Sequence, residues 1–109
     1  MNGEEFQKVL DDTFAKVTAV LGRKADEYAT NDRLHNFKKA AHLGGRTVEQ
    51  ALSGMLAKHT VSIYGMVESG KTFPIAVWDE KIVDHLNYLI LLRALVIEKA
   101  MEDIEKGGL

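Results

Sequence analysis

Three oxygen-bearing side chains recur at helical spacing in the most apolar stretch of the sequence. Glu80, Asp84 and Asn87 occupy positions i, i+4 and i+7. At 100° per residue they fall within about 60° of one another on a single helix face. Carboxylate and amide oxygens are the ligands that a hard cation such as Mg²⁺ prefers. The spacing therefore favours a Mg²⁺ (or Mn²⁺) site on this face.

A structural interpretation of the same stripe stays open. Glu80 is also an ordinary acid for the first turn of a helix, where it complements the helix dipole. Asp84 would then pair with a lysine or arginine from another helix, because burying an unpaired carboxylate is costly. Both interpretations require polar or charged groups opposite the stripe.

Two other segments offer such groups. Lys24 and Tyr28 continue the apolar face of the first segment, and Lys58 and His59 lie together in an apolar stretch further along. A lone histidine on an apolar face is more often a core residue than a ligand. A lone lysine there usually extends its amine to solvent. These alternatives also remain open.

A local positive patch lies between Asp32 and Glu49, where the sequence contains no acid. This patch suits phosphate groups, although a solvated helix face explains it equally well. Asn36 and Phe37, in the same segment, could contribute a contact to a base. The basic residues of the patch are Arg33, His35, Lys38, Lys39, His42 and Arg46.

The elements that position these residues are predicted to be helices. Apolar residues recur in steps of three and four in the first segment, which continues through Tyr28. Asn31 and Asp32 begin a short basic helix over residues 33–43, which Gly44 and Gly45 end. The apolar residues of the first segment are Phe6, Leu10, Phe14, Val17 and Leu21.

Two longer helices follow. Thr47 is predicted to cap the third, and Asp79 the last, which runs to about Lys106. From Ile82 to Ile97 apolar residues nearly encircle the last helix, so it should be central. We expect an all-α fold, a compact four-helix-bundle-like single domain over residues 1–109 with one short basic helix.

Composition excludes several classes of protein. The 109 residues contain no cysteine, which excludes disulfides, cysteine-ligated metals and a thiol nucleophile. The net charge of −2 argues against binding of duplex nucleic acid. The longest apolar run, Leu86–Ile97, is interrupted by Asn87 and Arg93 and is too short to span a bilayer. The acidic start shows no signal peptide, so we expect a cytoplasmic protein without a membrane partner.

Gly65–Thr72 matches the phosphate-loop pattern literally. That motif needs a strand feeding the loop within a parallel sheet. The residues before Gly65 keep helical spacing, and no other segment offers partner strands. The context therefore disfavours a phosphate loop.

The chain resembles the phage and bacterial nucleotide-modification-associated helical domain, a relative of the MazG-like all-α NTP pyrophosphatases. The resemblance rests on three separate blocks. The first is a lysine followed by an acid–tyrosine–small triplet and then an aromatic residue. The second is a lysine on an apolar helix, and the third is two acids followed by Asn-Tyr on the last helix. These blocks are Lys24–Ala29 with Asn36–Phe37, Leu56–His59, and Glu80–Tyr88.

The resemblance implies that a nucleoside triphosphate binds through Mg²⁺ and that water attacks its α–β phosphate bridge. Glu80 and Asp84 would be metal ligands, Glu27 a third ligand or water-orienting base, and Lys58 a catalytic contact to phosphate. It also implies a homodimer or homotetramer of phage or prophage type. The expected substrate-binding residues are Lys24, Tyr28, Arg33, Asn36, Lys38, His59, Asn87 and Tyr88.

Two functions follow from these observations. The first is a metal-dependent (deoxy)nucleotide-binding protein, similar to an NTP pyrophosphohydrolase. The alternative is a non-catalytic helical module that oligomerises or binds a partner protein, in which Asp84 pairs with Lys24 or Lys58 across helices.

Overall fold

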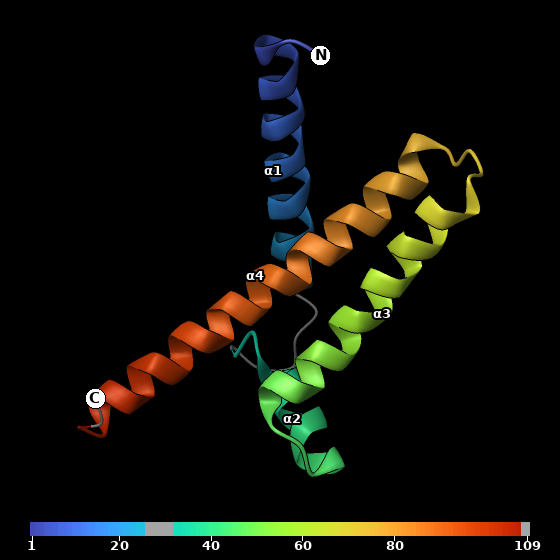
Figure 1. Cartoon of the computed structure of the whole chain (residues 1–109). Coiled ribbons are helices and arrows are strands. Elements are labelled where there is room, and N and C mark those ends of the chain that lie inside the picture. Colours follow the sequence, from blue (N-terminus) through green and yellow to red (C-terminus); the bar gives the residue numbers. More distant parts are fainter. Residues whose placement is uncertain (26–31, 108–109) are drawn as a thin grey trace.

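The computed structural model describes residues 1–25 and 32–107, and these form four helices with no strand among them. The all-α fold class is confirmed. Figure 1 shows α4 as the long central helix, with α3 antiparallel to it and α2 at the far end of α3. The helices are α1 (Gly3–Ala25), α2 (His35–Gly44), α3 (Val48–Ser69) and α4 (Ile75–Glu105).

The predicted C-terminal end of α2 and the predicted cap of α3 are confirmed. The predicted start of α2 is wrong: the helix begins at His35, and Leu34, which makes no side-chain cap bond, occupies the N-cap position. Gly45 follows α2 with a φ of 63°, a left-handed conformation that glycine adopts without steric cost. Thr47 caps α3 reciprocally: its hydroxyl accepts from the Gln50 backbone N–H at 3.1 Å, and the Gln50 side chain accepts from the Thr47 N–H at 2.9 Å.

The predicted start of α4 at Asp79 is wrong. The helix begins at Ile75, and Pro74 occupies the N-cap position with a φ of −57°. Proline is tolerated at this position because the N-cap residue precedes the helix, so its missing N–H removes no helical hydrogen bond, and its ring prevents the helix from starting earlier. Asp79 therefore lies inside α4.

The phosphate-loop pattern lies on helical backbone. Residues 65–69 form the last turn of α3, and Gly70 ends the helix with a φ of 66°. Residues 60–64, which would have to be the preceding strand, are also helical. The structural context that a phosphate loop requires is absent from this described segment.

The main core lies where α2, α3 and α4 meet. Leu52 of α3 is fully buried there and packs with Phe37 of α2 and Leu95 of α4. Leu34 closes the cluster from the turn before α2. Partly buried apolar side chains surround it: Val48, Tyr88, Leu91 and Leu92.

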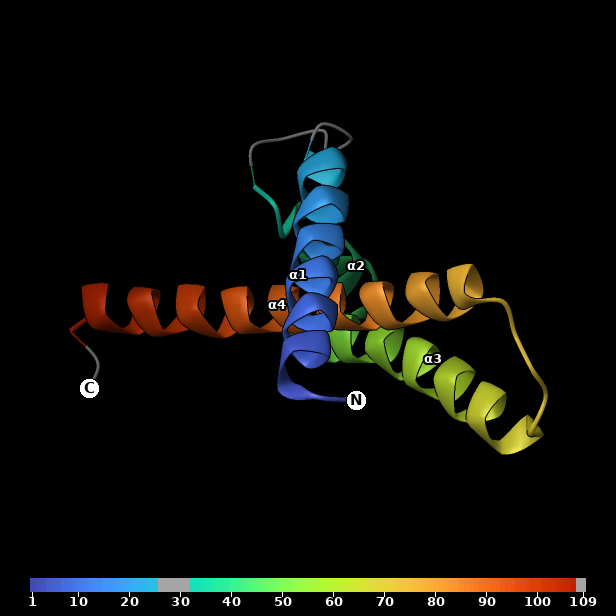
Figure 2. The ribbon, with the colours of Figure 1, turned by 90° about the horizontal axis from the view of Figure 1, so that it is seen from above.

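Helix α1 packs against α4 and, within the described residues, has no extensive contact with α2 or α3. Val17, buried where the two helices meet, anchors this contact. Figures 1 and 2 show α1 crossing α4 steeply, with the N-terminal part of α1 projecting away from the other helices. The molecule consequently measures 49 × 30 × 30 Å, with a radius of gyration of 16.8 Å.

No helix in the described part of the chain combines the length and apolar composition needed to cross a membrane.

Candidate functional site

Glu80 and Asp84, predicted as metal ligands, line one hollow of about 530 Å³ between α1 and α4. The opposite wall comes from α1, which contributes the cationic side chains Lys16 and Arg23. Asp79 adds a third carboxylate. The hollow therefore combines acids from one helix with bases from the other.

Lys16 connects the two walls. Its Nζ lies 2.8 Å from a carboxylate oxygen of Asp12 and 3.0 Å from one of Asp79. The hydrogen bond to Asp12, followed by that to Asp79, raises the pKa of Lys16 above its ordinary value. This contact holds α1 to the first turns of α4.

Glu80, Asp84 and Arg23 differ from Lys16 in having no ion-pair partner among the described residues. The two acids lie on successive turns of α4, as their spacing predicts. They are exposed and half-buried respectively, so a ligand entering from solvent can reach them. The predicted interhelical pairing of Asp84 with Lys58 does not occur.

Asn87, the third member of the stripe, is almost completely buried, with 4% of its surface exposed. Neither its amide oxygen nor its amide nitrogen has a hydrogen-bond partner in the described part of the chain. An orphaned buried amide costs free energy and usually indicates a strained or functional position. The stripe thus runs from exposed Glu80 inward to an amide that lies outside the lining of the hollow and has no hydrogen-bond partner among the described residues.

Tyr88 and His59 lie in the interface of α2, α3 and α4 and do not line the hollow. The His59 ring lies 4.7 Å from the Tyr88 ring, centroid to centroid, with 32° between their planes. Phe37 meets Tyr88 edge-on at 6.1 Å. For His59 this geometry matches the core interpretation.

Lys38 connects α2 to α4. Its Nζ lies 2.7 Å from a carboxylate oxygen of Asp32 and 2.7 Å from one of Glu98. These hydrogen bonds, that of Asp32 first, raise the pKa of Lys38, while the bond from Lys38 is the main cause that lowers the pKa of Asp32. Lys38 is thus engaged by two carboxylates. Elsewhere in the patch, Asn36 is exposed.

Arg33 donates to the backbone carbonyl of Leu21 at 2.7 Å. This bond joins the turn before α2 to the C-terminal part of α1. Of the predicted phosphate-contacting residues, Lys24 lies in the last turn of α1, near Arg23. Lys58 is exposed on α3 and does not line the hollow.

The predicted third ligand, Glu27, and the predicted pocket residue Tyr28 lie outside the described residues. Within residues 1–25 and 32–107, no three histidines, cysteines, aspartates or glutamates gather closely enough to hold a metal ion by themselves. Only Glu80 and Asp84 of the predicted ligand set are therefore brought together here.

Sequence reasoning missed Lys16 and Arg23 as residues of the hollow. Their spacing of seven, about two helical turns, places them on the same side of α1, but nothing in the sequence showed that this side faces α4. It also missed the bond between the Thr60 hydroxyl and His85 Nε2, 2.7 Å long, which joins α3 to α4.

No protein-family model, curated protein or solved structure matches this chain.

Proposed function

We propose that the hollow between α1 and α4 binds the phosphates of a (deoxy)nucleoside triphosphate together with Mg²⁺ or Mn²⁺. The supporting observation is that Glu80, Asp84 and Arg23, none ion-paired within the described residues, line one hollow. A volume of about 530 Å³ lies within the range of small-molecule sites.

The available carboxylates fit a magnesium ion that takes only some of its ligands from the protein. Mg²⁺ is usually bound through one or two carboxylates and completes its shell with water and substrate phosphates. Glu80 and Asp84 would supply those carboxylates, with Glu27 as the third ligand or water-orienting base that the resemblance implies. The ion would neutralise phosphate charge and lower the pKa of bound water.

The cationic wall supplies the complementary interaction. Arg23 presents a planar guanidinium that can bind two phosphate oxygens at once. Lys24, next to Arg23 in the chain, is the phosphate contact on this helix that the resemblance implies; Lys58, the other one it implies, lies on α3 outside the hollow. Asn87, one turn further along α4 and outside the lining of the hollow, would orient groups around the ligand rather than the phosphates themselves. Hydrolysis between the α- and β-phosphates, giving a monophosphate and pyrophosphate, is the reaction we propose.

The resemblance to MazG-like NTP pyrophosphatases extends this proposal. It implies a homodimer or homotetramer of phage or prophage type. A nucleotide substrate places the activity in the cytoplasm, where nucleotide pools are held.

A second candidate is a non-catalytic helical module that oligomerises or binds a partner protein. The large apolar side chains exposed on α1 and α4, such as Phe6, Phe14 and Ile104, favour it. In that case the Lys16–Asp79 contact is purely structural.

Thermal melting with a panel of deoxynucleoside triphosphates, with and without Mg²⁺, distinguishes the two functions. A ligand at 100 times its Kd stabilises the folded protein by about 2.7 kcal/mol, which corresponds to a rise in Tm of roughly 10 °C for a domain of this size. We expect such a rise only when nucleotide and metal are both present.

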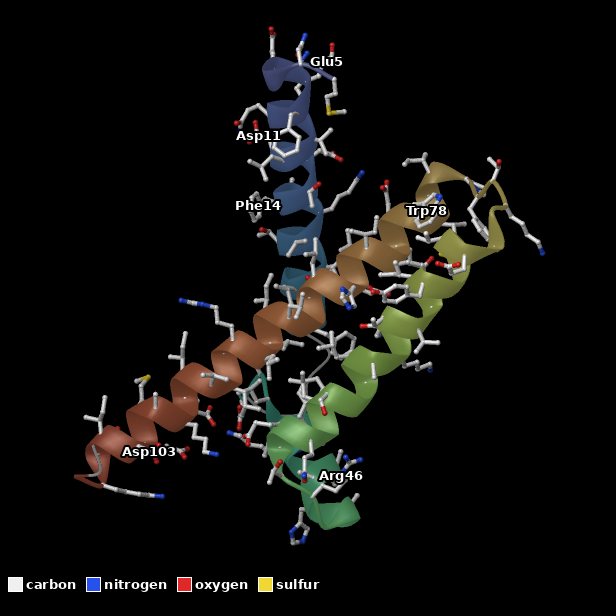
Figure 3. The ribbon with its side chains drawn as sticks, viewed as in Figure 1. Glu5, Asp11, Phe14, Arg46, Trp78 and Asp103 are labelled. Carbon is white, nitrogen blue, oxygen red and sulfur yellow. The ribbon has the colours of Figure 1, made fainter. Side chains whose placement is uncertain are left out.

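Asp84→Asn should abolish the metal-dependent rise in Tm because it removes one of the two ligand carboxylates while keeping the side-chain shape. Asp103→Asn is the matched control, since Asp103 is exposed near the distal end of the same helix (Figure 3). An Asp84→Asn protein that keeps the full nucleotide response would refute the site. Absence of any response in folded wild-type protein would favour the second candidate.

A further inference from the structure

The surface of this chain is larger than a folded monomer of its mass should expose. Its accessible surface is 8002 Å², whereas a compact 12.1 kDa protein exposes about 6,000 Å². Its radius of gyration, 16.8 Å, likewise exceeds the value of about 13 Å typical of its length. About 2,000 Å² is therefore in excess.

Much of the exposed apolar surface lies along one face of α4. Assigning 100° to each residue places every large apolar side chain that is exposed on this helix within an arc of about 140°. The stripe runs the whole length of the helix, and Arg93 lies in its middle. These side chains are Ile75, Ile82, Leu89, Ile90, Val96, Ile97, Met101 and Ile104.

The projecting part of α1 carries a matching face. Phe6, Val9, Leu10 and Phe14 also fall within an arc of about 140°, and Phe6 and Phe14 are 58% and 60% exposed. Figure 3 shows Phe14 pointing away from the body of α1. Only Val17, further along the same face, is buried against α4.

The two apolar faces meet at a corner. Between them lies a hollow of about 450 Å³, almost wholly apolar, at the crossing of α1 and α4. This hollow differs from the one lined by Glu80 and Asp84. Its apolar lining comprises Leu10, Phe14 and Val17 of α1, with Leu86, Leu89 and Ile90 of α4.

We propose that a second copy of this chain covers this corner, with α1 of each copy packed on the C-terminal half of α4 of the other. A two-fold dimer suits the corner because the same contact then forms twice, once in each direction. The lengths match: residues 3–14 of α1 span about 18 Å and residues 90–104 of α4 about 22 Å, at 1.5 Å per residue.

The area agrees with this occupant. A stable interface needs about 800 Å² from each partner, which the excess of about 2,000 Å² supplies. On α4, Arg93 borders the apolar hollow, and its long side chain can carry the guanidinium to the edge of the contact.

Light scattering coupled to size exclusion tests the proposal on the full chain, without metal or nucleotide, and so independently of the nucleotide site. The expected mass is about 24 kDa, twice 12.1 kDa. Phe6→Glu and Ile97→Glu, one on each face, should each give a monomer. Val61→Glu, at a position 69% exposed on α3, should leave the dimer intact.

Cross-linking keeps the test informative where a glutamate variant fails to fold. The chain has no cysteine, so Phe6→Cys and Ile97→Cys chains can be mixed and joined with a short bismaleimide. We expect a mixed cross-linked dimer, and none when Val61→Cys replaces either partner. Any of three results would overturn the proposal. These are a monomeric wild type, a dimer that only Val61→Glu disrupts, and an oligomer of any size without the cross-link between positions 6 and 97.

Discussion

At the scale of single residues, Asn87 is the side chain whose polarity suits its buried position in the fold least. Apart from Asp84, its neighbours on α4 are mostly apolar, and it is as deeply buried as the core leucines Leu34 and Leu95. Yet neither amide atom is hydrogen-bonded to any described residue. A polar residue at such a cost is the mark of a position kept for something other than stability.

Asn87→Leu should raise the free energy of unfolding by about 1–3 kcal/mol, because an apolar side chain of similar size replaces an unsatisfied amide. Urea denaturation measures this change. Under the proposed function the same variant loses its nucleotide-dependent rise in Tm. Asn36→Leu, at an exposed site, should change stability by less than about 0.5 kcal/mol. Loss of stability in Asn87→Leu would show that the amide has a partner.

At the scale of elements, charged side chains hold together helices that share few buried contacts. Lys16 links α1 to α4, and Lys38 links α2 and the preceding Asp32 to Glu98 of α4. Each lysine is engaged by two carboxylates rather than one, which favours a fixed geometry over an isolated surface pair. These ion pairs help to fix the relative orientation of helices that pack through their apolar faces.

The Lys38 link should contribute stability only between two pH limits. The folded-state pKa of Asp32 lies below its ordinary value of 3.8, so its contribution is complete above that value and is lost as the pH falls through the lowered pKa. The pKa of Lys38 lies above its ordinary value of 10.5, so its contribution is complete below that value and is lost at higher pH.

Lys38→Met should therefore lower the free energy of unfolding at neutral pH by up to about 1 kcal/mol, since both side chains are more than a third exposed and solvent screens them. The difference from wild type should shrink as the pH falls below 3.8. Urea denaturation across pH measures it, with Lys39→Met, at the exposed neighbouring position, as control. A deficit that persists unchanged in acid would contradict the assignment to Asp32.

At the scale of the whole molecule, the fold divides into a packed part and a projecting part. Helices α2, α3 and α4 share the cluster around Leu52, while α1 packs on no described helix other than α4 and otherwise accepts the bond from Arg33 to Leu21. A projecting helix with an apolar face has no partner of its own chain to bury that face. The stability of such a helix then depends on what covers its apolar face.

The melting temperature of the wild-type protein should therefore rise with protein concentration, because association stabilises the folded state by mass action. Calorimetry over a hundredfold range of concentration measures this, in the absence of nucleotide. The Phe6→Glu variant should melt at a lower temperature that does not depend on concentration. Equal, concentration-independent melting of both proteins would argue that α1 folds onto α4 without a second copy.

The sequence by itself determined the helices and most of their ends. Apolar spacing predicted four helices, and Thr47 and Gly45 act as the sequence predicts because capping depends on a few neighbouring residues. The start of α4 was misplaced at Asp79 because Pro74 takes the N-cap position five residues earlier. The helical grouping of Glu80, Asp84 and Asn87 was also readable, since it depends only on the period of one helix.

The tertiary structure alone decided what faces that stripe. Lys16 and Arg23 oppose it, whereas Lys58, an equally plausible partner from the sequence, is exposed on another helix. It also decided that the apolar face of α1 is left largely uncovered. Which faces meet depends on the crossing of helices far apart in the chain, and that is set by the packing of all the helices together rather than by the period of any one.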